Sequence, residues 1–317
     1  MPKISVIIPN YNHARYLEQR IESILNQTFQ DFEIIFLDDS STDNSREVFA
    51  KYTHHPKINQ IIFNEINSGS GYKQWSKGFS LATGEYIWIA ESDDYAEPTI
   101  LEKLVQKLDH NPSVGLAYTQ SWNINDEGER IHLCKEWTDA LDEVRWSGDF
   151  VNVGRDECKY LLDRNTIPNA SAVLMRRSVL IEAGKFDTQF RLAADYLLWA
   201  KMLMISDIAY IAEPLNYFRS HANTVRNTTR AALELEERLI VICYLLKGIQ
   251  APEPFWEQVF HPVVGWWMRL MASEKLPLSV NLRIYSILRD IDSNINYRIL
   301  RNSIEVLMRK VRSHPQV

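Results

Sequence analysis

Three acidic residues stand together near residue 90 of this chain, in the segment Glu91-Ser92-Asp93-Asp94. They directly follow the apolar run 86–90, which predicts a buried strand. Clustered carboxylates repel one another unless a cation lies between them. Mg²⁺ or Mn²⁺ takes one or two carboxylates and completes its coordination with water and phosphate oxygens. The segment therefore indicates a divalent-metal site that carries a diphosphate, although a solvated turn after a strand could use the same residues.

A second acidic segment, residues 38–43, follows another apolar run at 33–37. Ser41 or Thr42 is expected to cap the next helix, and Asp39 to face a ligand crevice. The alternative is that Asp39 is an acid at a helix N-terminus, where it would stabilise the helix dipole.

The elements that must position these residues alternate along the first hundred residues, which predicts βαβ units. Strands are expected at 5–8, 33–37, 58–63 and 86–90. Leu17, Ile21, Ile24 and Leu25 recur at helical spacing between the first two strands. The pattern favours an α/β fold with a mostly parallel, twisted sheet covered by helices on both faces.

The rest of the chain is expected to add strands at 115–122, 172–175 and 208–211 and a helix within 190–203, and to become helical from about residue 228 to the end. A hairpin or surface turn is expected at Asp126-Glu127-Gly128.

Composition limits the function classes. The formal net charge of −6 argues against a general nucleic-acid-binding protein, so no nucleic-acid partner is expected. The three cysteines lie far apart without metal-ligand spacing, which favours unpaired thiols in a reducing compartment. The sequence shows neither a secretory signal pattern nor an apolar run of membrane-spanning length. We therefore expect a cytoplasmic protein. The segment 263–269 is a candidate for peripheral contact with the inner face of a membrane. The alternative is that this segment is an ordinary helix packed against the rest of the protein.

Asp195 stands at the start of an apolar helix pattern, where partial desolvation could raise its pKa toward that of a general base. The alternative is a helix cap or first-turn acid. Trp122 and Trp137 have polar surroundings in the sequence and are candidates for stacking against the face of a pyranose ring, against the alternative that these tryptophans belong to the core.

The order of several motifs resembles the inverting glycosyltransferases of family 2, which have the GT-A fold. The resemblance covers about residues 3–222, through the segments 6–12, 37–43 and 84–94, through Asp195, and through Arg219-Ser220-His221. It implies a Rossmann-like GT-A domain at 1–225, with sugar-nucleotide binding in about 1–95 and acceptor binding in about 96–225. A helical region at 226–317 follows.

The resemblance also implies roles for individual residues. Asp93, Glu91 and His221 would hold Mn²⁺ or Mg²⁺, and Arg219 would bind phosphate. The family usually has aspartate where Glu91 stands, so Asp93 is favoured as a ligand. Asp195 would be the catalytic base. The remaining residues would bind the nucleotide: Pro9, Tyr11, Asp39, Asn67, Gly69 and Ser92.

The activity implied is transfer of a sugar, with inversion, from a nucleoside diphosphate sugar to a hydroxyl of a saccharide or lipid-linked saccharide. A UDP-sugar is favoured as donor, and surface polysaccharide or glycolipid biosynthesis as the process. The alternatives are a metal-dependent nucleotidyltransferase and a non-catalytic sugar-nucleotide-binding protein. The sequence leaves the oligomeric state unknown.

Overall fold

The computed structural model describes residues 1–167, 169–220, 231–250, 253–274 and 276–313. The chain divides into two compact units. The first comprises Met1–Tyr160 and Asn165–Thr224, and the second comprises Leu161–Arg164 and Val225–Val317. The domain boundary expected near residue 225 lies outside the described residues.

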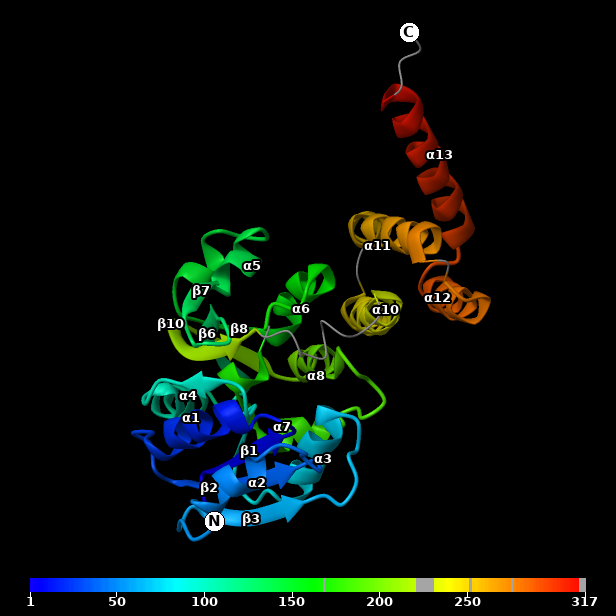
Figure 1. Cartoon of the computed structure of the whole chain (residues 1–317). Coiled ribbons are helices and arrows are strands. Elements are labelled where there is room, and N and C mark those ends of the chain that lie inside the picture. The colour runs from blue at the N-terminus through cyan, green and yellow to red at the C-terminus, as the bar shows by residue number, and fades with distance from the viewer. Residues whose placement is uncertain (168, 221–230, 251–252, 275, 314–317) are drawn as a thin grey trace. The chain divides into compact units, whose positions relative to one another are not determined.

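The first unit contains one ten-stranded sheet, whose strands follow the order β3-β2-β1-β4-β9-β6-β10-β5, with β7 beside β6 and β8 beside β10 (Figure 1). The strands are β1 Ile4–Asn10, β2 Phe32–Asp38, β3 Ile58–Phe63, β4 Tyr86–Ile89, β5 Tyr95–Ala96, β6 Val114–Ile124, β7 Arg130–Leu133, β8 Phe150–Asn152, β9 Val173–Arg176 and β10 Asp207–Arg219.

The helices of the first unit are α1 Ala14–Leu25, α2 Ser45–Ala50, α3 Gly71–Leu81, α4 Ile100–His110, α5 Lys135–Asp139, α6 Gly154–Asp163, α7 Arg177–Glu182 and α8 Ala194–Leu203. Two short 3₁₀ turns are η1 Arg145–Ser147 and η2 Ala170–Ala172. The last residues of α6 belong to the second unit.

The four N-terminal strands are parallel, as the βαβ pattern predicts. Beyond β4 the sheet is mixed, because β9 runs antiparallel to both of its neighbours while β6 and β10 are parallel. The expectation of a mostly parallel sheet therefore holds only for the first hundred residues. The later strands are joined by irregular segments that allow reversals of direction.

Both faces of the parallel strands are buried, which explains their unbroken apolar runs. Ile4, Val6 and Ile8 of β1 belong to a core that includes residues of α1, α2 and α4. The opposite face meets α3, where a Cβ built on Gly78 would lie 2.4 Å from Ile7. Helices on both faces thus hold the parallel strands in a fixed register.

Two local expectations have different outcomes. The turn at residues 126–128 is confirmed as the β6–β7 hairpin, in which Gly128 has a φ of +88° and donates its N–H to the carbonyl of Asn125. The cap predicted at Ser41 or Thr42 is wrong. The helix α2 begins later, at Ser45, and Asn44 is its N-cap residue.

The second unit contains the helices α10 Ala231–Ile249, α11 Glu253–Glu274, α12 Leu278–Ile291 and α13 Ile295–Ser313. This confirms the helical pattern predicted for the C-terminal region. Among the described residues, no helix is both long and apolar enough to cross a membrane.

Candidate functional site

The two acidic segments meet at one edge of the sheet. β2 and β4 both pair in parallel with β1, so their carboxyl ends lie at the same edge. Asp38 ends β2, and the segment 91–94 comes directly after β4. This is the edge at which open α/β sheets bind ligands.

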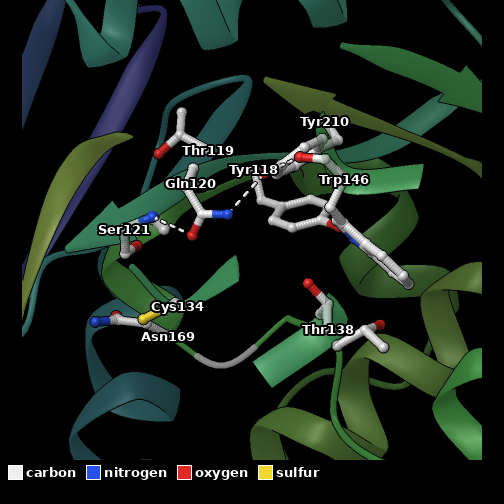
Figure 2. Close-up of a pocket in the computed structure, with 11 residues that line it drawn as sticks. Tyr118, Thr119, Gln120, Ser121, Cys134, Thr138, Trp146, Asn169 and Tyr210 are labelled. Carbon is white, nitrogen blue, oxygen red and sulfur yellow. Dashed lines mark hydrogen bonds between the residues drawn. The ribbon is translucent and has the colours of Figure 1, made fainter. Parts of the chain in front are cut away.

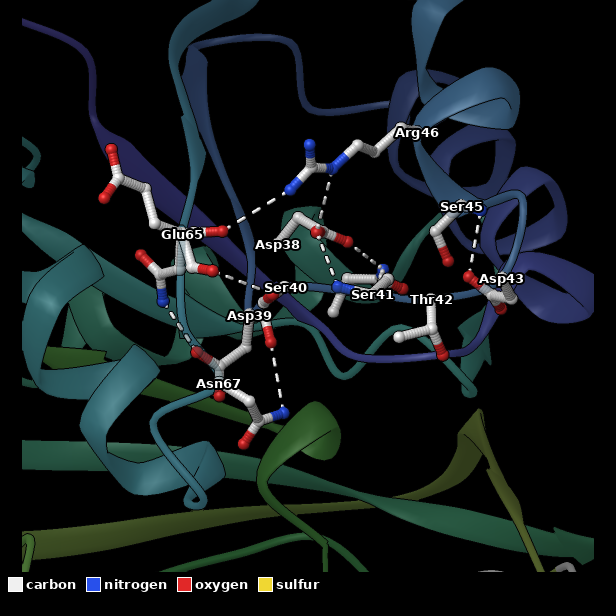
Figure 3. A network of polar contacts seen from close by, with 12 residues as sticks. Asp38, Asp39, Ser40, Ser41, Thr42, Asp43, Ser45, Arg46, Glu65 and Asn67 are labelled. Carbon is white, nitrogen blue, oxygen red and sulfur yellow. Dashed lines mark hydrogen bonds and ion pairs between the residues drawn. The ribbon is translucent and has the colours of Figure 1, made fainter.

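Asp38 and Asp39 use their carboxylates to order the loops at this edge (Figure 3). Asp38 is buried and accepts hydrogen bonds from Asn10 Nδ2 at 2.9 Å and from the backbone N–H of Ser41 at 3.0 Å. Its Oδ1 also lies 3.6 Å from Nε of Arg46. These contacts fix the turn that leads out of β2.

Asp39 anchors the loop between β3 and α3. Its carboxylate accepts hydrogen bonds from Asn64 Nδ2 at 2.6 Å, Ser68 Oγ at 2.7 Å and Gln74 Nε2 at 2.8 Å. Asn67 Nδ2 donates to the backbone carbonyl of Asp39 at 3.1 Å. The nearest following helix begins at Ser45, so Asp39 is not a helix N-terminal acid. Its carboxylate instead holds the loop in which the donor-binding residues Asn67 and Gly69 were predicted.

The other residues predicted to bind nucleotide come from the same edge. Tyr11, just after β1, is 45 % exposed, whereas Pro9 is buried within β1 and shapes the edge from beneath. Ser92 is buried, and its Oγ lies 2.8 Å from Nδ1 of His13. Gly69 has a φ of +75°, a left-handed conformation that favours glycine in an exposed tight loop.

The three carboxylates after β4 have different environments. Asp94 is buried and accepts hydrogen bonds from the backbone N–H of Arg219 at 2.9 Å and from Asn169 Nδ2 at 3.1 Å. Glu91 and Asp93 are partly exposed, and Trp75 Nε1 donates to Glu91 Oε1 at 2.6 Å. Asp94 therefore ties the loop to β10 and to the start of η2, whereas Glu91 contacts Trp75 of α3.

Electrostatics show that this loop is short of positive charge. Burial, together with the charges of Asp93 and Asp94, raises the pKa of Glu91 to about 8. Burial and the charge of Asp93 likewise raise the pKa of Asp94 above its ordinary value. A cation placed among these carboxylates would reverse both effects.

The donor set fits a hard divalent ion. Among the described residues, no group of three or more His, Cys, Asp or Glu side chains is arranged to enclose a metal ion. An ion that keeps water and phosphate oxygens as ligands needs only one or two carboxylates, which Asp93 and Glu91 can supply. The predicted third ligand, His221, lies outside the described residues.

Arg219 has a different environment from the one predicted. Its side chain is buried, and Nε donates to the backbone carbonyl of Asp93 at 2.8 Å. Nη1 donates to the carbonyls of Asn125 and Asp126, and Nη2 donates to Gln19 Oε1. These contacts favour a structural clamp between β10, the acidic loop and the β6–β7 turn over the predicted phosphate contact.

Asp195 lies in the first turn of α8 and is partly exposed. Tyr72 Oη donates to its Oδ1 at 3.3 Å, and Asn165 Nδ2 lies 3.5 Å from its Oδ2. Tyr72 also bonds the carbonyl of Leu192, just before α8. The side chain is thus oriented by residues from α3 and from the segment after α6, rather than by its own helix alone.

A small pocket is lined by residues of β6 and of the segments packed against it (Figure 2). Trp146 Nε1 donates to Tyr118 Oη at 2.9 Å, and Gln120 Nε2 donates to Tyr210 Oη at 2.8 Å. Asn169, which holds Asp94, also lines the pocket. Trp137 is 52 % exposed, and its Nε1 donates to the carbonyl of Asn165 at 3.1 Å, whereas Trp122 is partly buried.

Sequence reasoning missed His13, Trp75 and Asn169 as parts of this site. Each contacts the acidic loop from a distant segment, as the separation of 75 residues between Asn169 and Asp94 shows.

Comparison with known proteins identifies the type of molecule. The model of the family described as glycosyl transferase family 2 matches residues 5–182. An uncharacterized glycosyltransferase of Nostoc sp. is 31 % identical over 243 residues, which is 74 % of this chain and 70 % of that protein.

Solved structures share the fold. S. aureus TarS in complex with UDP-GlcNAc has a TM-score of 0.69 at 17 % identity, covering 95 % of this chain and 89 % of that one. The Pyrobaculum calidifontis mannosyltransferase PcManGT, in complex with GDP-Man and Mn²⁺, has a TM-score of 0.53 at 16 % identity, with coverages of 96 % and 87 %. By the family match over more than half of its length, this chain belongs to glycosyltransferase family 2 and is a glycosyltransferase with the GT-A fold.

Proposed function

We propose that this glycosyltransferase transfers a sugar with inversion from a nucleoside diphosphate sugar, with a UDP-sugar favoured, to a hydroxyl of a saccharide or lipid-linked saccharide. The observation that carries the proposal is the meeting of two loops at one sheet edge. One loop is anchored by Asp39, and the other contains Glu91 and Asp93. The UDP-GlcNAc and GDP-Man complexes of proteins with this fold support a sugar-nucleotide donor.

The nucleotide would lie between these loops. Tyr11 offers a partly exposed ring, and the segment Asn67–Gly69 offers backbone that a ligand can approach closely. Asp39 would act mainly through the loop that it holds, because four donor groups already surround its carboxylate. Ser92 would shape the same pocket through its contact with His13.

Asp93 and Glu91 would hold Mn²⁺ or Mg²⁺, and His221 stays a predicted further ligand. When bound, such an ion supplies positive charge to the diphosphate as it leaves. The Mn²⁺ present in the PcManGT complex supports this part of the proposal.

Asp195 would be the base. In a single displacement, the acceptor oxygen forms a bond to the anomeric carbon while the bond from that carbon to the diphosphate oxygen breaks. The electron pair of the broken bond leaves with the diphosphate, and the acceptor proton passes to a carboxylate oxygen of Asp195. The hydrogen bond from Tyr72 and the nearby Asn165 would keep that carboxylate in a fixed orientation.

The acceptor would enter from the side of β6 and α5, where Trp137 is exposed and the pocket of Figure 2 lies. We place the enzyme in the cytoplasm, at the inner face of a membrane, in surface polysaccharide or glycolipid biosynthesis. The segment 263–269, predicted for membrane contact, includes the buried residues Val263, Val264 and Trp267. The membrane contact is therefore better assigned to exposed apolar residues of α12 and α13: Leu278, Leu282, Tyr297, Leu300 and Ile304.

The test is calorimetric binding of UDP, GDP, dTDP and CDP, each with Mn²⁺ and with chelator. We expect one nucleotide to bind in a metal-dependent way, and we expect Asp93→Ala to abolish that binding. Asp156→Ala removes an exposed acid from α6 and is the matched control. Absence of nucleotide binding to the wild type under every condition would overturn the proposal.

A further inference from the structure

Arg20 is a fully buried cation beneath the acidic loop. It lies on α1 and has 0 % exposure, on the face that also buries Leu17, Ile21 and Ile24. Nε, Nη1 and Nη2 all lack a hydrogen-bond partner in the structure. The helical spacing of this face predicts an apolar residue at this position, so the charge requires a separate explanation.

Burial of an arginine in this way is unfavourable unless something compensates for its lost hydration. The guanidinium lies 4.9 Å from the centre of the Trp88 ring, which gives a cation–π contact. Its remaining compensation is electrostatic and comes from Asp94, Glu91 and Asp93. Although burial lowers the pKa of Arg20 to about 10, the side chain stays protonated at neutral pH.

Arg20 acts on these carboxylates without bonding to them. Asp94 accepts its hydrogen bonds from Arg219 and Asn169, and Glu91 accepts one from Trp75. Those contacts already orient the carboxylates. What Arg20 adds is one buried positive charge near the loop, beside the ring of Trp88 in β4.

The charge count gives this position a function. When a divalent cation is bound and the three carboxylates are ionised, their charges, the charge of the Arg20 guanidinium and the charge of the cation sum to zero. Without Arg20 the same loop would stay at −1 after metal binding and would repel a diphosphate. We infer that Arg20 is a positioning residue that sets the charge of the acidic loop, so that the metal-loaded site is neutral when the diphosphate of the donor arrives. This inference rests on the proposed function.

The first experiment compares Arg20→Met, which removes the charge, with Arg20→Lys, which keeps it. Ile24→Val perturbs the same buried face without a change of charge and is the packing control. Mn²⁺ binding is measured without nucleotide, and UDP binding is then measured at saturating Mn²⁺. We expect Arg20→Met to bind Mn²⁺ at least as tightly as the wild type but UDP about tenfold more weakly, with Arg20→Lys restoring most of the UDP affinity.

A purely structural role would give a different pattern. It would weaken Mn²⁺ and UDP binding together, and Ile24→Val would show a similar loss. That pattern, or UDP affinity in Arg20→Met within twofold of the wild type, would overturn the inference. Absence of nucleotide binding to the wild type would instead overturn the proposed function, and the second experiment would then decide on Arg20.

The second experiment needs neither metal nor nucleotide. It is a double-mutant cycle of Arg20→Met and Asp94→Asn, measured by chemical unfolding of metal-free protein at about pH 8.5, where most carboxylates are ionised. We expect Asp94→Asn, introduced into the Arg20→Met variant, to recover part of the stability that Arg20→Met loses. The unfolding equilibrium constant of the double variant should differ about tenfold from the value expected if the two single effects were additive. If Arg20→Met does not fold, the double variant should fold. Additive effects, or a double variant that is also unfolded, would contradict the inference.

Discussion

At the scale of the residue, two carboxylates show how environment decides function. Asp195 and Glu33 both accept hydrogen bonds from other parts of the chain. Asp195 is partly exposed and lies at the edge of the site, whereas Glu33 is buried within β2, far along the strand from its carboxyl end. Asp195 is the proposed base, and Glu33 is expected to contribute to stability.

Asp195→Asn should lower kcat by about 10²–10⁴, because the isosteric amide cannot accept the acceptor proton. The KM for the sugar nucleotide should change little, since the nucleotide residues lie on other loops. Steady-state kinetics with varied donor and acceptor measure both quantities. Asp156→Asn is the control, because Asp156 is also a first-turn helix acid and would show any general effect of the helix dipole. A similar loss of kcat in Asp195→Asn and Asp156→Asn would show that Asp195 is not the catalytic base.

Glu33 should make stability depend on pH. Burial raises its pKa, but hydrogen bonds from Ser5 and Thr83 outweigh burial and hold the pKa below its ordinary value. A pKa that is lower in the folded than in the unfolded state stabilises the fold above the unfolded value of about 4.3. That stabilisation is lost as the pH falls through the folded pKa.

Glu33→Gln should therefore lower the free energy of unfolding by about 1 kcal/mol at neutral pH, and the difference from the wild type should vanish in acid. Chemical unfolding at a series of pH values measures this difference. Glu47→Gln, at an exposed position of α2, should show no comparable pH dependence. A difference that persists unchanged into acid would show that the charge of Glu33 contributes nothing.

At the scale of the element, the site depends on how closely β4 lies against β1. The chain enters β4 through Gly84, whose N–H donates to Ser5 Oγ at 2.8 Å. A Cβ built on Gly84 would lie 2.5 Å from the backbone nitrogen of Ser5 and 2.7 Å from the carbonyl carbon of Ile4. Because both neighbours are backbone atoms, neither can turn aside as a side chain could.

Gly84→Ala should destabilise the protein by about 1–3 kcal/mol, since it forces β4 away from β1. The loop that carries Asp93 follows β4, so metal-dependent nucleotide binding should weaken as well. Gly71→Ala is the matched control, because a Cβ on Gly71 meets nothing within 4 Å and alanine favours the helix that begins there. Thermal unfolding of the wild type and of both variants measures the difference in stability. Equal stability of Gly84→Ala and Gly71→Ala would show that β4 can move away from β1 without loss of stability.

At the scale of the whole molecule, the family membership removes two alternatives left open by the sequence, a nucleotidyltransferase and a non-catalytic binding protein. The charge distribution adds a further feature. Residues 278–317 contain seven basic and three acidic residues, a net charge of +4, while the rest of the chain carries −10. Exposed apolar residues on α12 and α13 accompany this basic segment, a combination that favours an anionic lipid surface.

The full chain should therefore sediment with vesicles of anionic phospholipid and less with zwitterionic ones. Leu300→Ser, at a 59 % exposed position of α13, should reduce that binding several-fold through the loss of buried apolar area. Ile131→Ser removes an exposed apolar side chain from β7 in the first unit and is the control. Equal binding by both variants, or wild-type protein that stays in the supernatant, would remove the membrane contact from the proposal.

From the amino-acid pattern alone we could predict the parallel strands, the helices of the C-terminal region and the position of two acidic segments at strand ends. Periodicity of apolar residues is a local property, and burial on both faces leaves a continuous apolar run that can be read directly. The β6–β7 turn was predictable for the same reason, because glycine and acidic residues favour turns wherever they occur.

The contacts of the individual carboxylates, in contrast, depend on the tertiary structure. Asp94 is joined to Arg219 across 125 residues and to Asn169 across 75. Arg20, on the amphipathic helix α1, is buried against the ring of Trp88 in β4. Long-range contacts also determine the direction of β9, the hydrogen bonds of Arg219 to the acidic loop and the hydrogen bond of Tyr72 to Asp195. Such contacts join segments that are distant in the chain, and no local pattern specifies them, because they form only when the sheet and its helices pack together.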